Sequence, residues 1–148
     1  MSKSNTFEND MLQLIFNNVN IGLVGDATGL RGSSAAGNLY MSLHSADPGE
    51  AGNQTTNEVT YAGYARVAVP RDNTGFTVAG NQVSLAADAV FPTGNTGAAS
   101  GTATHFGVGT ANAGAGMLLY KGALSPASIP VGDSVTPRLT TGTVITED

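Results

Sequence analysis

Apolar and polar residues alternate along residues 38–44. Leu39, Met41 and Leu43 stand at every second position, and polar residues such as Ser42 and His44 stand between them. A period of two is typical of a strand with one buried face and one exposed face. The Asp-Pro-Gly sequence at 47–49 then stops the pattern, since proline removes a donor and glycine accepts the positive φ of a turn.

The same plan of a short strand followed by Gly, Pro, Asn or Asp is repeated along the rest of the chain. Further strands are predicted at 61–69, 76–78, 83–86, 89–91, 102–109 and 143–146. The apolar run at 117–121 is typical of a more fully buried strand, and a short edge strand is predicted near Ile129. About eight short strands with turn residues every 8–12 positions favour a mainly β fold, an antiparallel β-sandwich or jelly roll.

Residues 5–18 are predicted to form the one short helix, at the N-terminus. Asn5 or Thr6 can cap it, and Glu8 lies three residues after Asn5, as a capping box requires. One face of this helix is apolar and its members are Phe7, Met11, Leu14 and Ile15, with Leu12 and Phe16 widening the stripe. The stripe must be buried against the sheet or a neighbouring subunit, and core packing is the favoured interpretation.

The length of 148 residues fits a single domain with enough core to fold without disulfides. Residues 1–37 are expected to hold the helix and a contact loop, and residues 38–148 the antiparallel sandwich of the same domain. The loop contains Gly25 and Gly29 but no Gly-x-x-x-x-Gly-Lys sequence, so it is not a phosphate-binding loop.

The composition is poor in charge and rich in glycine. Charged residues make up 11% of the chain, against about 25% in an average soluble domain, and there are 20 glycines and no cysteine. Such a surface suits a protein that is largely covered by copies of itself or by a partner. A merely neutral β-domain remains the alternative.

Charge argues against a nucleic-acid partner. The net charge is −5, and the six basic residues are scattered along the chain, whereas a protein that binds the phosphate backbone needs them clustered. No apolar run approaches the ~20 residues that span a bilayer, and the first residues lack the apolar segment of a secretory signal. Neither nucleic acid nor membrane is therefore expected as a partner.

No constellation of catalytic or metal-binding residues is recognisable. His44 and His105 flank alternating apolar positions, so we expect both to face solvent or a subunit seam as hydrogen-bonding strand residues. No Gly-x-Ser-x-Gly or His-Glu-x-x-His sequence is present. Asp47 is expected to bond the backbone two residues on rather than to hold a cation. We therefore expect that the chain is not an enzyme and that it needs no cofactor or metal.

The blocks around these strands resemble a family of small virion proteins of tailed bacteriophages. The resemblance rests on Leu-Tyr-Met-Ser-Leu-His-Ser-Ala-Asp-Pro-Gly-Glu at 39–50, and continues at 61–69, 91–92, 103–111, 118–124 and 146–148. Such proteins are often labelled tail-fibre proteins, while the size, single domain and lack of a fibrous repeat look more like a capsid decoration, or cement, protein. The resemblance implies no catalytic residues.

The favoured function is therefore a cement protein that bridges subunits of the phage major capsid protein on the outer capsid surface, after assembly in the host cytoplasm. It is expected to form a homotrimer or homodimer. The alternative is a tail-fibre or tail-tip adhesin that binds the host surface, present in few copies. The partner-contact candidates lie in the helix, the loop at 21–34 and the glycine-rich tract at 94–101: Phe7, Met11, Leu14, Phe16, Ile21, Leu23, Leu30, Arg31, Gly94 and Asn95.

Overall fold

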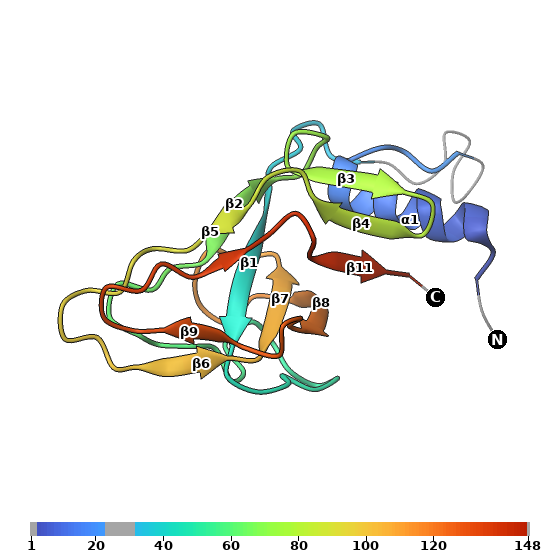
Figure 1. The fold of residues 1–148 in the computed structure, drawn as a ribbon. Helices are drawn as coiled ribbons and strands as arrows, with labels where there is room; N and C mark the ends of the chain where they lie inside the picture. The colour runs from blue at the N-terminus through green and yellow to red at the C-terminus, as the bar shows by residue number, and fades with distance from the viewer. Residues whose placement is uncertain (1–2, 23–31, 148) are drawn as a thin grey trace. The chain divides into compact units, whose positions relative to one another are not determined.

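The chain is mainly antiparallel β with one N-terminal helix, as the alternating pattern predicts. A computed structural model describes residues 3–22 and 32–147. In these residues one helix and eleven strands form several small antiparallel sheets (Figure 1). The elements are α1 (Asn5–Asn17), β1 (Asn38–His44), β2 (Val67–Pro70), β3 (Phe76–Ala79), β4 (Gln82–Leu85), β5 (Ala89–Val90), β6 (Gly101–Ala103), β7 (His105–Gly109), β8 (Leu118–Ala123), β9 (Ile129–Val131), β10 (Arg138–Leu139) and β11 (Val144–Thr146).

The chain divides into two compact units. The first contains residues 1–38, 70–87 and 141–148, and the second contains residues 39–69 and 88–140. The first unit therefore takes in β3, β4 and β11 in addition to the helix and the loop. The boundary at residue 37 between helix-and-loop and sandwich stays a prediction.

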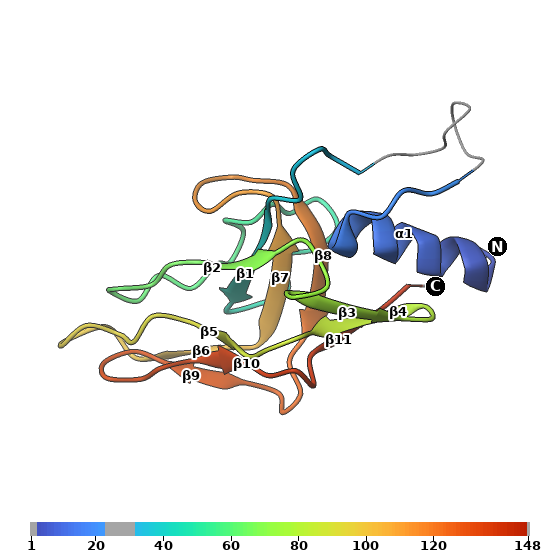
Figure 2. The same ribbon diagram turned by 90° about the horizontal axis from the view of Figure 1, so that it is seen from above.

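In the first unit, helix α1 packs on the sheet of order β11-β4-β3 (Figure 2). Leu12 and Phe16 are completely buried, and the Phe16 ring meets Phe76 of β3 edge-on at a centroid distance of 5.0 Å. Burying an aromatic pair in this geometry contributes about 0.5–1.5 kcal/mol beyond its area. The two residues that widened the predicted stripe are thus the ones packed in the core, together with Glu8. The four central stripe residues, Phe7, Met11, Leu14 and Ile15, are only half-buried, so the predicted buried face of the helix was wrong.

The N-terminal end of α1 differs from the sequence prediction. Ser4, and not Asn5 or Thr6, is the N-cap, and its Oγ accepts a bond from the Phe7 N–H at 3.4 Å. At the other end, Arg71 donates to the Leu14 carbonyl (3.2 Å) and to Asn18 Oδ1 (2.6 Å). Arg71 lies far away in sequence, and it places a positive charge where the helix dipole favours one.

In the second unit, β1 and β7 pair in a sheet of order β2-β1-β7-β8. Their antiparallel register sets Met41 beside Val108 and Leu43 beside Phe106. These four side chains belong to one face of the sheet, and all four are buried. The alternate positions form the other face, which carries polar side chains and glycine.

Three strand predictions were wrong in extent or burial. The strand at 61–69 is confined to β2, because Tyr61 to Tyr64 form a turn with Gly63 at φ 95°. The strand at 102–109 is broken at Thr104 into β6 and β7, which pair with different strands. The run at 117–121 falls largely in β8, which is half-buried because it lies at the edge of its sheet.

The remaining strands of the second unit form two-stranded pairs. β5 pairs with β10, a strand without a sequence prediction, and β6 pairs with the short β9 predicted near Ile129. Gly94 and Gly132 approach so closely that a Cβ on Gly94 would collide with the Gly132 carbonyl. Only glycine fits at this crossing.

Candidate functional site

The polar face of the β1–β7 pair is buried under the loop at 45–66. His44 is fully buried, with its Nε2 2.8 Å from Ser42 Oγ and its Nδ1 2.8 Å from the Thr56 carbonyl. Burial lowers the pKa of His44, although the Thr56 carbonyl acts in the opposite direction. The hydrogen-bonding role expected for His44 is confirmed, and the expected solvent-facing position is wrong, because the following loop covers this face.

His105 lies beside His44 in the sheet register but is only half-buried. Its Nδ1 is 2.9 Å from Thr104 Oγ1. A catalytic imidazole needs a nucleophile and an orienting carboxylate within hydrogen-bond reach. The ring nitrogens of the two histidines bond to hydroxyls and to a carbonyl, which is the pattern of structural hydrogen bonding.

Next to His44, a buried ion pair lies within the loop at 45–66, and its arginine also bonds to the loop after β7. Arg66 donates from Nε and Nη2 to the two Glu58 oxygens, each at 2.7 Å, and from Nη1 to the Ala111 carbonyl at 2.9 Å. The Tyr64 hydroxyl also donates to Glu58, at 2.9 Å. The hydrogen bond with Glu58 raises the pKa of Arg66, and burial raises the pKa of Tyr64.

Gln54 belongs to the same group of polar side chains as Ser42, His44, Glu58 and Arg66. We call this group the polar layer. The Gln54 side chain is completely buried, accepts from the Ala111 N–H at 2.9 Å and donates to the Ala111 carbonyl at 3.2 Å. Gly109 and Gly116 leave the room that Gln54 needs, since a Cβ on either would collide with its side chain. The layer holds loops in place, and the Nδ1 of His44 meets the Thr56 carbonyl and not a carboxylate that could orient the ring for catalysis. In the parts of the chain that the structure describes, no group of three or more metal-ligating side chains gathers either.

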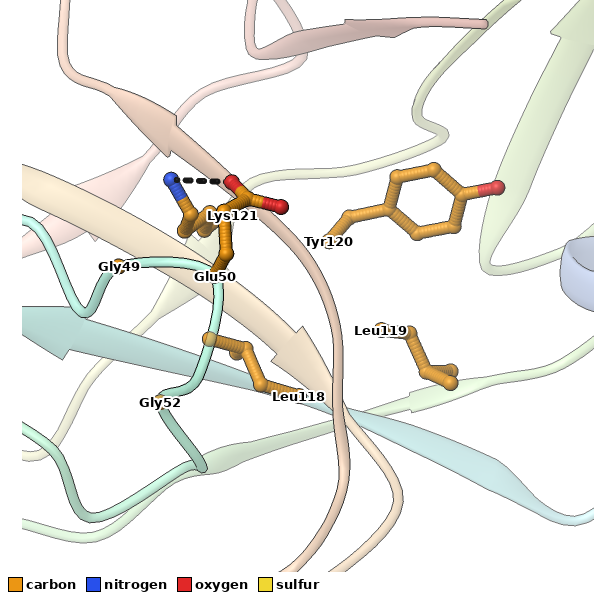
Figure 3. A pocket seen from close by; sticks show the side chains of 7 residues that line it. All are labelled: Gly49, Glu50, Gly52, Leu118, Leu119, Tyr120 and Lys121. Atoms are coloured by element: carbon orange, nitrogen blue, oxygen red, sulfur yellow. Dashed lines mark ion pairs between the residues drawn. The ribbon is translucent and has the colours of Figure 1, made fainter.

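The open polar feature of the second unit is a hollow of about 260 Å³ beside β8. Its walls are the turn with Gly49, Glu50 and Gly52 on one side and residues 118–121 of β8 on the other (Figure 3). Because glycine has no side chain, the turn presents mostly backbone to the hollow. We call this feature the edge hollow.

Three charged side chains meet at the edge hollow. Lys121 Nζ lies 2.9 Å from Asp47 and 3.4 Å from Glu50. The Gly49 N–H, which donates to Asp47 at 2.8 Å, and then Lys121 lower the pKa of Asp47. The hydrogen bond that Lys121 donates to Asp47 raises the pKa of Lys121. The bond to Gly49 confirms the turn role predicted for Asp47.

The edge hollow follows the backbone of β8. In Figure 3, Leu118 and Lys121 extend toward the turn, whereas Leu119 and Tyr120 extend the other way. All four residues nevertheless line the hollow. Consecutive residues that point in different directions can share one hollow only where the strand presents its main chain to it. The site is therefore an open strand edge with a charged pair beside it.

The contact candidates predicted from the sequence are placed elsewhere. Phe16 and Ile21 are buried, Phe7, Met11 and Leu14 are half-buried on α1, and Gly94 is buried at its crossing with Gly132. Asn95 is exposed, and Leu23, Leu30 and Arg31 lie outside the described residues. Their contact role stays a prediction. Sequence reasoning missed the edge hollow, although an apolar run after a glycine-rich loop was the available signal.

Comparison with known proteins gives one match over nearly the whole chain. The family model described as "Podophage GP4 fiber I protein gp80" matches residues 2–146. None of the curated proteins compared with the chain matches it. Among the described residues, no helix is both long and apolar enough to cross a bilayer.

Proposed function

Because the chain belongs to the podophage GP4 fiber I protein gp80 family, we propose that it is a structural subunit of a fibre on the phage virion. The observation that carries this proposal is the extent of the family match, residues 2–146 of 148. The family description names a fibre protein and not a capsid protein. It therefore favours the fibre alternative over the capsid-cement role and the outer capsid surface that the sequence analysis preferred.

The chemistry of the chain is consistent with a non-enzymatic role. The buried polar groups around Glu58 and Arg66 bond to one another and to backbone carbonyls. Because these groups are already paired within the protein, they stabilise the loops. The charged content of 11% leaves a surface with few long side chains to desolvate, and interfaces are depleted of Lys and Glu. A subunit of this kind contributes surface area to an assembly.

Locating the protein on intact particles tests this function. Gold-labelled antibody against the chain is applied to purified virions, and its copy number is measured by densitometry against the major capsid protein. A fibre subunit is expected to carry label at the tail and to be present in few copies. Label spread over the head, with a copy number comparable to that of the major capsid protein, would contradict the fibre role.

A loss-of-function experiment separates attachment from particle strength. Virions that lack the protein are expected to adsorb poorly to host cells and to resist heat and low ionic strength as well as complete virions do. Virions that adsorb normally and burst more easily would instead support the cement role.

A further inference from the structure

The open edge of β8 has the properties of a surface that receives a strand from another protein. We propose that an extended, basic segment of a different virion protein pairs with β8 and lies in the edge hollow, where a cationic side chain of the segment meets Glu50. The proposal rests on the fibre role, because a fibre subunit has to be attached to other proteins of the particle. It adds the surface of attachment and the chemistry of the partner.

The backbone of β8 has hydrogen-bonding groups on the side away from β7. The Leu124 N–H donates to the Thr104 carbonyl at 2.9 Å, so these two facing residues form a hydrogen-bonded pair. Hydrogen-bonded pairs alternate with non-bonded pairs along an antiparallel ladder. The N–H and C=O groups of Lys121 and Ala123 therefore point away from β7, toward the open edge. Within the residues that the structure describes, no strand pairs with β8 on that side.

The edge lacks the features that usually block pairing. Natural edge strands are protected by proline, by free lysine charges or by being short. The opposite edge of the same sheet, β2, has four residues and ends at Pro70. β8 has six residues, contains no proline, and its lysine is held by Asp47 and Glu50. An extended peptide that adds a strand to such an edge gains main-chain hydrogen bonds.

The charges beside the edge favour a basic partner. Asp47 and Glu50 bring two carboxylates to the hollow and Lys121 brings one ammonium, so one negative charge is left over. The Lys121 ammonium lies closer to Asp47, at 2.9 Å, than to Glu50, at 3.4 Å, and the Glu50 side chain is 96% exposed. Glu50 is thus the carboxylate that can accept from a second cation. The net charge of −5 on the chain attracts a basic segment over a longer range.

Peptides of six residues, the length of β8, test the pairing on the whole chain. The probe alternates lysine with valine, a residue that favours strands. One control replaces each lysine with glutamate, and the other keeps the lysines but is methylated at every backbone nitrogen, so that it cannot donate to a ladder. In NMR titrations, the lysine peptide is expected to shift the amide signals of Lys121 and Ala123 and to bind more tightly than either control. Equal binding of either control would overturn the proposal.

Variants of the chain provide a second test. Ala123→Pro removes an N–H that points away from β7, whereas Ala123→Val keeps it. The lysine peptide is expected to bind Ala123→Val as it binds the natural chain, and not to bind Ala123→Pro. Glu50→Gln is expected to weaken binding about two- to fivefold, because one exposed ion pair is lost. Unchanged binding to Glu50→Gln would overturn the charge match, and this arm stands even if Ala123→Pro fails to fold.

The same titrations identify a different occupant of the edge. Amide signals of β8 that shift when the chain alone is diluted, and do not respond to the lysine peptide, would assign the edge to a second copy and overturn the proposal. On the particle, virions made with Ala123→Val are expected to keep the tail label and those made with Ala123→Pro to lose it. Full tail label in Ala123→Pro virions would overturn attachment through β8.

The failure of this proposal is distinguishable from the failure of the fibre role. Label at the tail, combined with no response of β8 to the lysine peptide, would remove the strand site and leave the fibre role standing. Binding of the lysine peptide to β8 in a chain that is absent from the tail would remove the fibre role and leave the strand site standing.

Discussion

Two ion pairs in the second unit have opposite surroundings. The Arg66 side chain is 2% exposed, and both its carboxylate partner and its remaining donors are satisfied inside the protein. Lys121 is 25% exposed and meets Glu50, which is 96% exposed, at an open strand edge. A buried pair costs stability when it is broken, whereas an exposed pair contributes little to folding. The buried pair therefore maintains the fold, whereas the exposed pair contributes little to it.

The largest loss in the free energy of unfolding is expected when the buried ion pair of Arg66 and Glu58 is broken. Arg66→Leu leaves the Glu58 carboxylate without its cation and the Gly114 carbonyl without its donor from Arg66, while the Ala111 carbonyl keeps only the bond from Gln54. Removing one partner of a buried pair costs about 3–5 kcal/mol. Urea unfolding of Arg66→Leu is expected to show a loss of this size, while Lys121→Leu unfolds close to the natural chain. Equal losses in both variants would contradict the contrast between the two pairs.

A smaller effect is expected from crowding the polar layer. A Cβ on Gly107 would lie 2.7 Å from both His44 Nε2 and Ser42 Oγ, which bond to each other. Overpacking of this kind costs about 1–3 kcal/mol. Gly107→Ala is expected to lower the free energy of unfolding by that amount. Gly101→Ala serves as a control for losing glycine itself, because a Cβ there would meet only Val131, at an ordinary contact distance of 3.6 Å.

The pH dependence of stability gives a third, smaller effect. Burial lowers the pKa of His44 in the folded chain, so the unfolded chain binds the proton more readily. Stability is therefore complete above the ordinary histidine pKa of about 6.5 and declines as the pH falls toward the lower folded value. Melting temperatures of the natural chain and of His44→Gln are compared across this range. The decline is expected to be weaker in His44→Gln, and parallel curves would contradict the role given to burial.

The smallest effect on folding is expected at the edge hollow. Glu50→Gln removes a charge from a side chain that is almost fully exposed, so the melting temperature is expected to stay close to that of the natural chain. A melting temperature lowered as far as that of Arg66→Leu would contradict the contrast between the two pairs.

The strand plan of the fold could be predicted from the sequence because alternation and turn residues are local signals. β1, β3 and β4 lie where the period of two placed them, and the Phe7–Phe16 stripe lies on one helix. The Ser4 cap was missed because serine, asparagine and threonine are adjacent and all can cap. Two predicted strands are interrupted, one by the turn at Gly63 and the other at Thr104. In both cases the course of the backbone depends on pairing with other segments of the chain.

The polar layer and the edge hollow could not be predicted, because both depend on contacts between distant residues. Arg66 reaches carbonyls 45 and 48 residues away, and Gln54 reaches Ala111 across 57 residues. The apolar run at 117–121 indicated burial on both faces, whereas its position at the edge of the sheet leaves it half-exposed. Strand order determines that difference, and a hydrophobicity pattern does not contain it.

The most direct test of the contrast between the buried and the open pair is a double-mutant cycle at each of them. Arg66→Leu, Glu58→Leu and the double variant are unfolded with urea, beside Lys121→Leu, Glu50→Leu and their double variant. The coupling free energy is expected to be large for Arg66 and Glu58, and about 0–1 kcal/mol for Lys121 and Glu50, because the second pair is exposed. Equal coupling free energies at the two pairs would contradict the contrast.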